Sequence, residues 1–298
     1  MATKRLQLSL LSRIPCQRNM TGFRFLLVAA FSIVYGLACA AQAPAPAPVE
    51  SPDLAGLAHA AIRVADLDKS RAFYQKLGFE EAFSMSQGGT TTQSFIKIND
   101  RQFLEIYPQR NPAEPIGFMH VCFEATDIEA LNRSYVARGL SPTEVRKAGA
   151  GNLLFTMAGP EKQNLEYTQY MPGSKHTNDK GFHLGASRIS EKIVAAGIEM
   201  QDAASAVTFY RDKLAFTPAP SLLPGQTWLA LPGLPSQEVE IVQHAPGSVF
   251  HLFLGVSDLR HAEAQLKALD LQVEKQKGML SIQDPDGNQI VFLKAKPS

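Results

Sequence analysis

The chain contains very little cysteine and little net charge. Its 298 residues include three cysteines, Cys16, Cys39 and Cys122, and the first two lie close to the N-terminus. A mature chain cut after Cys39 keeps a single thiol, which excludes an intramolecular disulfide framework. The formal net charge is +1, so bulk charge gives no indication of a nucleic-acid or membrane-surface partner. Stability must therefore come from an apolar core or from a bound metal.

Long apolar runs are also scarce, and the one present lies near the N-terminus. It extends from Phe25 to Ala38, follows several basic residues, and ends in the small residues Ala38-Cys39-Ala40-Ala41. Such a run is short for a membrane span and typical of a secretion signal. We therefore expect residues 1–41 to be a signal peptide and the mature protein to be periplasmic or secreted. No membrane contact is expected afterwards unless Cys39 is lipidated. The alternation of Ala and Pro from Ala43 to Val49 predicts that residues 42–54 form an extended linker.

Two histidine–glutamate pairs recur with one spacing. Glu105 follows His59, and Glu166 follows His120, by 46 positions in each case (105 − 59 and 166 − 120). Each histidine opens a strand-like run, and each glutamate lies inside another. A duplicated unit of this kind can place two imidazoles and two carboxylates around a pseudo-two-fold axis. Such a set suits a divalent ion such as zinc, nickel, manganese or iron, with positions left for water or substrate.

The rest of the chain divides into four similar units. In the first, a strand with His59 leads to Asp66, a candidate helix cap, then to a helix and three further strands. The pattern repeats at His120, and weaker copies begin near residues 193 and 250. We expect residues 55–172 to form a first domain of two units. Residues 173–190 would then connect it to a second domain of two units, residues 191–296.

Two segments resemble a known group of proteins. The segment from Asp66 to Phe79 and the turn from Asp284 to Asn288 are similar to the vicinal oxygen chelate superfamily, which holds glyoxalases, extradiol dioxygenases and bleomycin-resistance proteins. The resemblance implies an α+β fold whose four βαβββ units form two curved mixed sheets, open barrels with helices outside. It also implies that the metal ligands are first-strand histidines and last-strand glutamates, which here are His59, Glu105, His120 and Glu166.

The second domain keeps half of this ligand set. Ala195 stands at the histidine position of the third unit, whose Glu240 is retained. The fourth unit retains His251 but has Val291 at the glutamate position. A metal site built from these two units alone is therefore not expected.

The order in which the units pair is open to one alternative. Units one and four could pair, which would place His251 beside His59 and Glu105. Units two and three would then place Glu240 beside His120 and Glu166. The short connection between the first two units favours pairing one with two.

Three further side chains are candidates for substrate contacts. Arg63, Cys122 and Glu124 follow the two histidines at alternate positions along their strands, so they share the face of the ligands. A lone buried cysteine such as Cys122 is more often a small apolar residue than a ligand or nucleophile. In the connecting segment, we expect His176 to face solvent.

Three functions are consistent with these observations. The first is a metal-dependent lyase or isomerase of the glyoxalase kind, for which the resemblance makes Glu166 the catalytic base. The second is an extradiol-type Fe(II) dioxygenase, whose usual set of two histidines and one carboxylate leaves Glu105 as an extra ligand. The third is a metal-free binding protein of the resistance kind, which the loss of half of the ligand set in the second domain favours. Each implies a small-molecule partner and no nucleic acid, and a homodimer is a candidate assembly.

Overall fold

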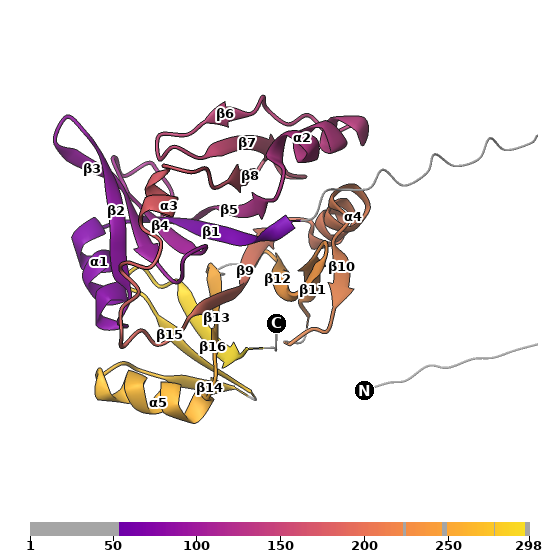
Figure 1. The fold of residues 1–298 in the computed structure, drawn as a ribbon. Coiled ribbons are helices and arrows are strands. Elements are labelled where there is room, and N and C mark those ends of the chain that lie inside the picture. Colours follow the sequence, from indigo (N-terminus) through magenta and orange to yellow (C-terminus); the bar gives the residue numbers. More distant parts are fainter. Residues whose placement is uncertain (1–53, 223–224, 246–248, 277, 296–298) are drawn as a thin grey trace, which may run out of the picture. The chain divides into compact units, whose positions relative to one another are not determined.

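The computed structural model describes residues 54–222, 225–245, 249–276 and 278–295, and these residues form two eight-stranded sheets with few helices (Figure 1). The expected signal peptide lies outside the described residues, as does nearly all of the expected linker. The fold class expected from the sequence is confirmed, because four units of a strand, a helix and three more strands make two mixed sheets.

The elements follow one another in the same order in each unit. Unit one contains β1 (Leu54–Val64), α1 (Leu67–Lys76), β2 (Glu80–Gln87), β3 (Thr90–Lys97) and β4 (Phe103–Pro108). Unit two contains β5 (Gly117–Ala125), α2 (Ile128–Ala137), β6 (Arg146–Lys147), β7 (Leu153–Ala158) and β8 (Asn164–Gln169). The connecting segment carries α3 (Lys175–Asn178). Unit three contains β9 (Lys192–Met200), α4 (Ala203–Leu214), β10 (Thr217–Ala219), β11 (Thr227–Leu231) and β12 (Leu234–Gln243). Unit four contains β13 (His251–Val256), α5 (Leu259–Ala268), β14 (Glu274–Gln276), β15 (Met279–Gln283) and β16 (Gln289–Lys294).

Both sheets have the same topology. The strand orders are β2-β3-β4-β1-β5-β8-β7-β6 and β10-β11-β12-β9-β13-β16-β15-β14. The first strands β1 and β5 are antiparallel neighbours at the centre, and each lies parallel to the last strand of its own unit, β4 or β8. The alternative pairing of units is therefore wrong, because β13 pairs with β9 and not with β1. Consecutive units joined by a short connection dock along their first strands.

An aspartate begins the main helix of every unit. Its side chain accepts a hydrogen bond from a backbone N–H of the first turn, which satisfies a group that the helix itself leaves unpaired, in Asp66, Asp127, Asp202 and Asp258. The helices pack on one face of each sheet. Buried apolar strand residues such as Leu104 and Val121 share a core with helix residues such as Tyr74 and Leu131. The helices leave the opposite face of each sheet uncovered, and this face is called the inner face below.

The two halves of the chain contact each other through specific polar groups. Tyr74 on α1 donates a hydrogen bond to Asp284 Oδ2 at 3.0 Å. Gln102 Nε2 donates to the carbonyl oxygen of Ile193 at 2.9 Å, and its Oε1 accepts from the Ile193 backbone N–H at 2.8 Å. Asp284 belongs to the turn before β16, so the Tyr74 hydrogen bond links the first unit to the fourth.

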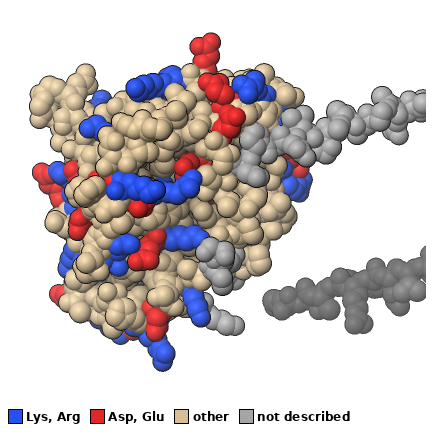
Figure 2. Space-filling view, viewed as in Figure 1, with Lys and Arg blue, Asp and Glu red and all other residues tan. Residues whose placement is uncertain are grey.

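The surface carries both signs of charge. On the face drawn in Figure 2, basic and acidic side chains are interspersed, in keeping with the net charge of +1. In the described part of the chain, every helix is too short or too polar to cross a lipid bilayer.

Candidate metal centre

A row of three polar side chains crosses the middle of the first sheet. The row consists of His59, Cys122 and Glu166. Backbone pairing aligns them, because His59 on β1 is opposite Cys122 on β5, and Cys122 is beside Glu166 on β8. Side chains alternate between the two faces of a strand, so directly paired residues project to the same face. All three side chains therefore reach the inner face.

A second row lies beside the first. Glu105 on β4 pairs with Ala61 on β1, and Ala61 pairs in turn with His120 on β5. Because Ala61 is two residues after His59, this row also faces inward. The two rows together bring the repeated histidines and glutamates to one place.

The four predicted ligands lie close together. His59 Nε2 is 3.1 Å from His120 Nε2 and 3.5 Å from Glu166 Oε1, and His59 Nδ1 is 3.3 Å from Glu105 Oε1. Two nitrogen or oxygen atoms bound to one zinc-like ion are separated by about 3.0–3.4 Å. The exposed fractions of His59, Glu105 and His120 are 4%, 4% and 6%. The ligand atoms of His59, Glu105 and His120 lie within 4.8 Å of one another, so this set is compatible with one buried ion, and metal binding by these residues stays a prediction.

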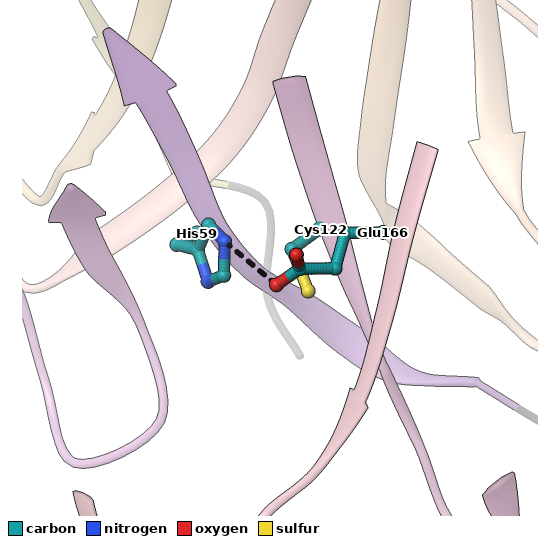
Figure 3. Close-up of side chains that lie close together, drawn as sticks. All are labelled: His59, Cys122 and Glu166. Carbon is teal, nitrogen blue, oxygen red and sulfur yellow. Dashed lines mark ion pairs between the residues drawn. The ribbon is translucent and has the colours of Figure 1, made fainter. Parts of the chain in front are cut away.

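His59 belongs to two groups of three candidate ligands. One consists of His59, Glu105 and His120, and the other of His59, Cys122 and Glu166; in each, the ligand atoms lie within 4.8 Å of one another. Figure 3 shows the Glu166 carboxylate directed at the His59 ring, with the Cys122 sulfur beside it. Glu166 therefore groups with the thiol rather than with Glu105. Repulsion between two buried carboxylates is a physical reason for this separation.

On the second sheet, an apolar cluster occupies part of the corresponding inner face. This buried cluster comprises Val194, Ala195, Trp228, Phe253, Met279, Val291 and Leu293. His251 Nδ1 lies 2.8 Å from Glu240 Oε2, so these two retained residues pair with each other. The alternative ligand sets, in which His251 or Glu240 joins the ligands of the first domain, are wrong, because both residues lie on the other sheet.

Comparison with known proteins identifies the family of the chain. A family model described as the Glyoxalase/Bleomycin resistance protein/Dioxygenase superfamily matches residues 56–167 and 192–292. The chain belongs to this superfamily.

Several solved structures of the superfamily are similar in fold. The 2,3-dioxygenase LapB from Pseudomonas sp. KL28 has a TM-score of 0.62 at 15% identity, covering 83% of this chain and 94% of its own. A Mn(II)-bound glyoxalase from Novosphingobium aromaticivorans has a TM-score of 0.62 at 16% identity, covering 81% and 82%. Homoprotocatechuate 2,3-dioxygenase from Brevibacterium fuscum, solved with 3,4-dihydroxyphenylacetate, has a TM-score of 0.61 at 17% identity, covering 84% and 83%. No curated protein matches the sequence significantly.

The sequence analysis missed two residues that hydrogen-bond to Glu105. Glu105 Oε2 accepts hydrogen bonds from Gln93 Nε2 at 2.7 Å and from the Tyr107 hydroxyl at 3.0 Å. Tyr107 lies two positions after Glu105, so strand alternation could have placed it on the inner face. Gln93 lies on β3, and its proximity depends on the register between β3 and β4.

Burial sets the protonation of the centre. Desolvation, and then the charge of Glu166, raise the pKa of Glu105, while hydrogen bonds from Tyr107 and Gln93 oppose this. Burial likewise raises the pKa of Glu166, against a hydrogen bond from Cys122. Burial lowers the pKa of His59 well below its usual value and that of His120 to about 4. Both imidazoles are therefore neutral near pH 7, which is the form that binds metals.

The residues fit a divalent ion on their own chemistry. His59 Nδ1 is buried without a hydrogen-bond partner, and two carboxylates are buried beside neutral imidazoles. Burying carboxylates without compensating charge is costly, and a dication offsets that cost. Two nitrogens, two carboxylates and a nearby thiol are a donor set suited to borderline ions.

The expected substrate contacts Arg63 and Glu124 are both engaged with protein groups. Arg63 donates to the Pro115 carbonyl oxygen at 3.0 Å and lies 3.6 Å from Glu114 Oε2. Glu124 forms an ion pair with Arg101 at 2.7 Å. A substrate would have to displace these partners, and contact with it stays a prediction for both residues.

The expectation that His176 faces solvent is wrong. This residue of α3 is 3% exposed, stacks on Tyr170 at 4.7 Å between ring centroids, and hydrogen-bonds with Asn152 at 3.0 Å. Its ring also contacts the rings of three inner-face phenylalanines, Phe83, Phe95 and Phe103. The connecting segment folds back over the inner face, which no periodic pattern in the segment indicated.

Proposed function

We propose that the first domain binds one divalent metal ion and catalyses a lyase or isomerase reaction of the glyoxalase kind. The substrate would be a small molecule with adjacent oxygens. His59, Glu105, His120 and Glu166 would hold the ion. A bound divalent ion supplies positive charge that stabilises negative charge developing on substrate oxygens. Membership of the superfamily and the fold shared with a Mn(II)-bound glyoxalase support the proposal.

The unequal surroundings of the two glutamates carry the proposal. Glu105 is fixed by donors from Gln93 and Tyr107, and its side chain is 5% exposed. Glu166 contacts the Cys122 thiol and has a side chain that is 16% exposed. A fixed carboxylate is suited to hold a ligand position. A more accessible one, with a pKa raised towards neutrality, is suited to accept and return a proton.

The proton transfer balances within the substrate. Glu166 takes a proton from the carbon beside a carbonyl, and the C–H electron pair moves towards that carbonyl oxygen. The same carboxyl then returns the proton to the former carbonyl carbon, and the hydroxyl proton of the first carbon moves to the former carbonyl oxygen, so the net change is an isomerisation. The neutral imidazoles of His59 and His120 take no proton and keep their lone pairs for binding.

Metal analysis and isotope exchange test this proposal. Protein purified without a metal-binding tag should contain about one divalent ion per chain. Hemithioacetals formed from methylglyoxal with glutathione, and with smaller thiols, should take up solvent deuterium at the carbon beside the carbonyl. Glu166→Gln should retain the metal and slow this exchange about 10²–10⁴-fold. Glu240→Gln is the matched control on the second sheet and should behave like the wild type. Absence of bound metal, or equal exchange in both variants, would overturn the proposal.

A specific contact favours a second candidate, an extradiol-type Fe(II) dioxygenase. His59, Glu105 and His120, whose ligand atoms lie within 4.8 Å of one another, make two histidines and one carboxylate, the usual ligand set of such iron centres. Glu166 then lies outside this set, in the second group with His59 and Cys122. Oxygen uptake by Fe(II)-loaded protein with catechol or 3,4-dihydroxyphenylacetate would identify this activity, and its absence would leave the lyase.

The location of the protein is a separate proposal. The apolar run and small residues before Gln42 support export to the periplasm or beyond, where the partner would be a small molecule. N-terminal sequencing of exported protein should find a first residue between Cys39 and Gln42. Mature protein that begins before Phe25 would contradict export by cleavage.

A further inference from the structure

Cys122 breaks the symmetry of the two repeated units. The units are offset by 61 positions, as the contact between His59 and His120 shows, so Ala61 of unit one is the counterpart of Cys122. Backbone pairing agrees, because Ala61 lies opposite His120 and Cys122 lies opposite His59. Unit one thus presents a methyl group to the centre, and unit two presents a sulfur.

The position of the sulfur matches that of a ligand. Cys122 stands between His59 and Glu166 in their row across the sheet. Its Sγ lies within 4.8 Å of a ligand atom of each (Figure 3). The residue is fully buried; its thiol hydrogen-bonds to the Glu166 carboxylate and lies 3.9 Å from the Phe123 carbonyl oxygen. The sulfur therefore already contacts one candidate ligand, Glu166, and lies beside another, His59.

The second sheet provides an internal comparison. There, Phe253 is beside Val291 and opposite Ala195, which are the places that Cys122, Glu166 and His59 take in the first sheet. Where the ligands have become apolar, the third position is a phenyl ring packed into their cluster. The thiol thus accompanies the complete ligand set.

We propose that Cys122 is a direct ligand of the metal in the first domain and makes the centre selective for borderline ions. This inference rests on the proposed function, because it assumes that a metal binds. On binding, the thiol releases its proton to solvent and the sulfur forms the bond to the ion. Thiolate ligands favour Zn²⁺ and Co²⁺, whereas oxygen ligands suit Mn²⁺ and Mg²⁺. The centre therefore prefers Zn²⁺ or Co²⁺ over Mn²⁺.

Cobalt spectroscopy tests this ligand directly. Full-length protein loaded with Co²⁺ should show a near-ultraviolet charge-transfer band from thiolate sulfur to cobalt. The band should disappear in Cys122→Ser, while Co²⁺ remains bound through the other ligands. Val121→Ala is the matched control, because this neighbour faces the helices on the opposite side of the same strand and its loss should leave the band intact. In competition, the preference for Zn²⁺ over Mn²⁺ should fall at least about tenfold in Cys122→Ser.

A second variant avoids any change in the core. Cys16→Ser combined with Cys39→Ser removes the two other thiols, and the band should persist in this protein. If Co²⁺ binds at one per chain without the band, the Cys122 inference fails and the proposed metal function stands. If no Co²⁺ or other divalent ion binds, both fail together.

Discussion

The Nε2 atoms of His59 and His120 lie 3.1 Å apart, although the residues belong to different repeats. Burial lowers the pKa of both imidazoles, so neither ring carries a charge that would repel the other near pH 7. At most one ring can donate an N–H to the other, and a shared ion would use both lone pairs. Under the proposed metal binding, the metal content of the protein should therefore depend on each of the two histidines.

Replacing His120 by Ala should abolish stoichiometric metal binding, because one of two close nitrogen donors is lost. The measurement is metal content after dialysis, by elemental analysis. His251→Ala is the matched control, since His251 occupies the corresponding place in the second sheet and pairs with Glu240. Unchanged metal content in His120→Ala would contradict the assigned ligand set.

Replacing Tyr107 by Phe should weaken metal binding without unfolding the protein. The hydroxyl holds Glu105 Oε2 at 3.0 Å, and losing such an outer hydrogen bond typically costs about 10–100-fold in metal affinity. Competition with a chelator measures the affinity. Tyr167→Phe removes a hydroxyl from the helix-covered side of the sheet and should keep wild-type affinity, so equal affinities in the two variants would argue against a role for Glu105.

The metal-free protein should lose stability as the pH rises from about 6.5 to 8. Burial raises the pKa of Glu166 to about 7 and of Glu105 to about 8, from 4.5. In this range the folded protein holds protons that the unfolded chain has released, so folding weakens with pH, by about 1–3 kcal/mol in total. The two histidines make stability rise with pH instead, because the unfolded chain protonates them and the folded protein keeps them neutral. This effect ends near pH 6.5, roughly the pKa of a histidine in the unfolded chain.

Urea unfolding at several pH values measures this dependence. The double variant Glu105→Gln with Glu166→Gln should show a flat profile over the same range. Added metal should remove the decline in the wild type, because it binds the ionised carboxylates. A metal-free wild type whose stability rises between pH 6.5 and 8 would show that the carboxyls are not held protonated.

Replacing Lys97 by Met should destabilise the protein by about 3 kcal/mol, because it leaves a buried carboxylate without its cation. Lys97 is fully buried, and its Nζ contacts Asp179 Oδ2 at 2.8 Å and the carbonyl oxygen of Phe182 at 2.7 Å. These contacts hold the connecting segment that carries His176. Lys147→Met at an exposed position should change the unfolding free energy by less than about 0.5 kcal/mol. Similar effects of the two substitutions would mean that the buried pair contributes nothing.

The sequence by itself determined the repeating unit and its chemistry. Aspartates such as Asp66 mark the start of each helix because their side chains satisfy free N–H groups locally. The equal spacing of His59 to Glu105 and His120 to Glu166 identified the four candidate ligands, since first and last strands of a unit lie side by side. These features depend on interactions within a unit, so they can be read from neighbouring residues.

The tertiary structure decided what depends on contacts between units. Strand register placed Cys122 between His59 and Glu166, and the spacing along one chain could not reveal that pairing. The docking of β1 on β5 settled which units combine, and the fold of the connecting segment buried His176 against inner-face aromatic rings. Such contacts join residues far apart in the sequence and leave no local pattern, because many arrangements of the same four units would satisfy the same local preferences.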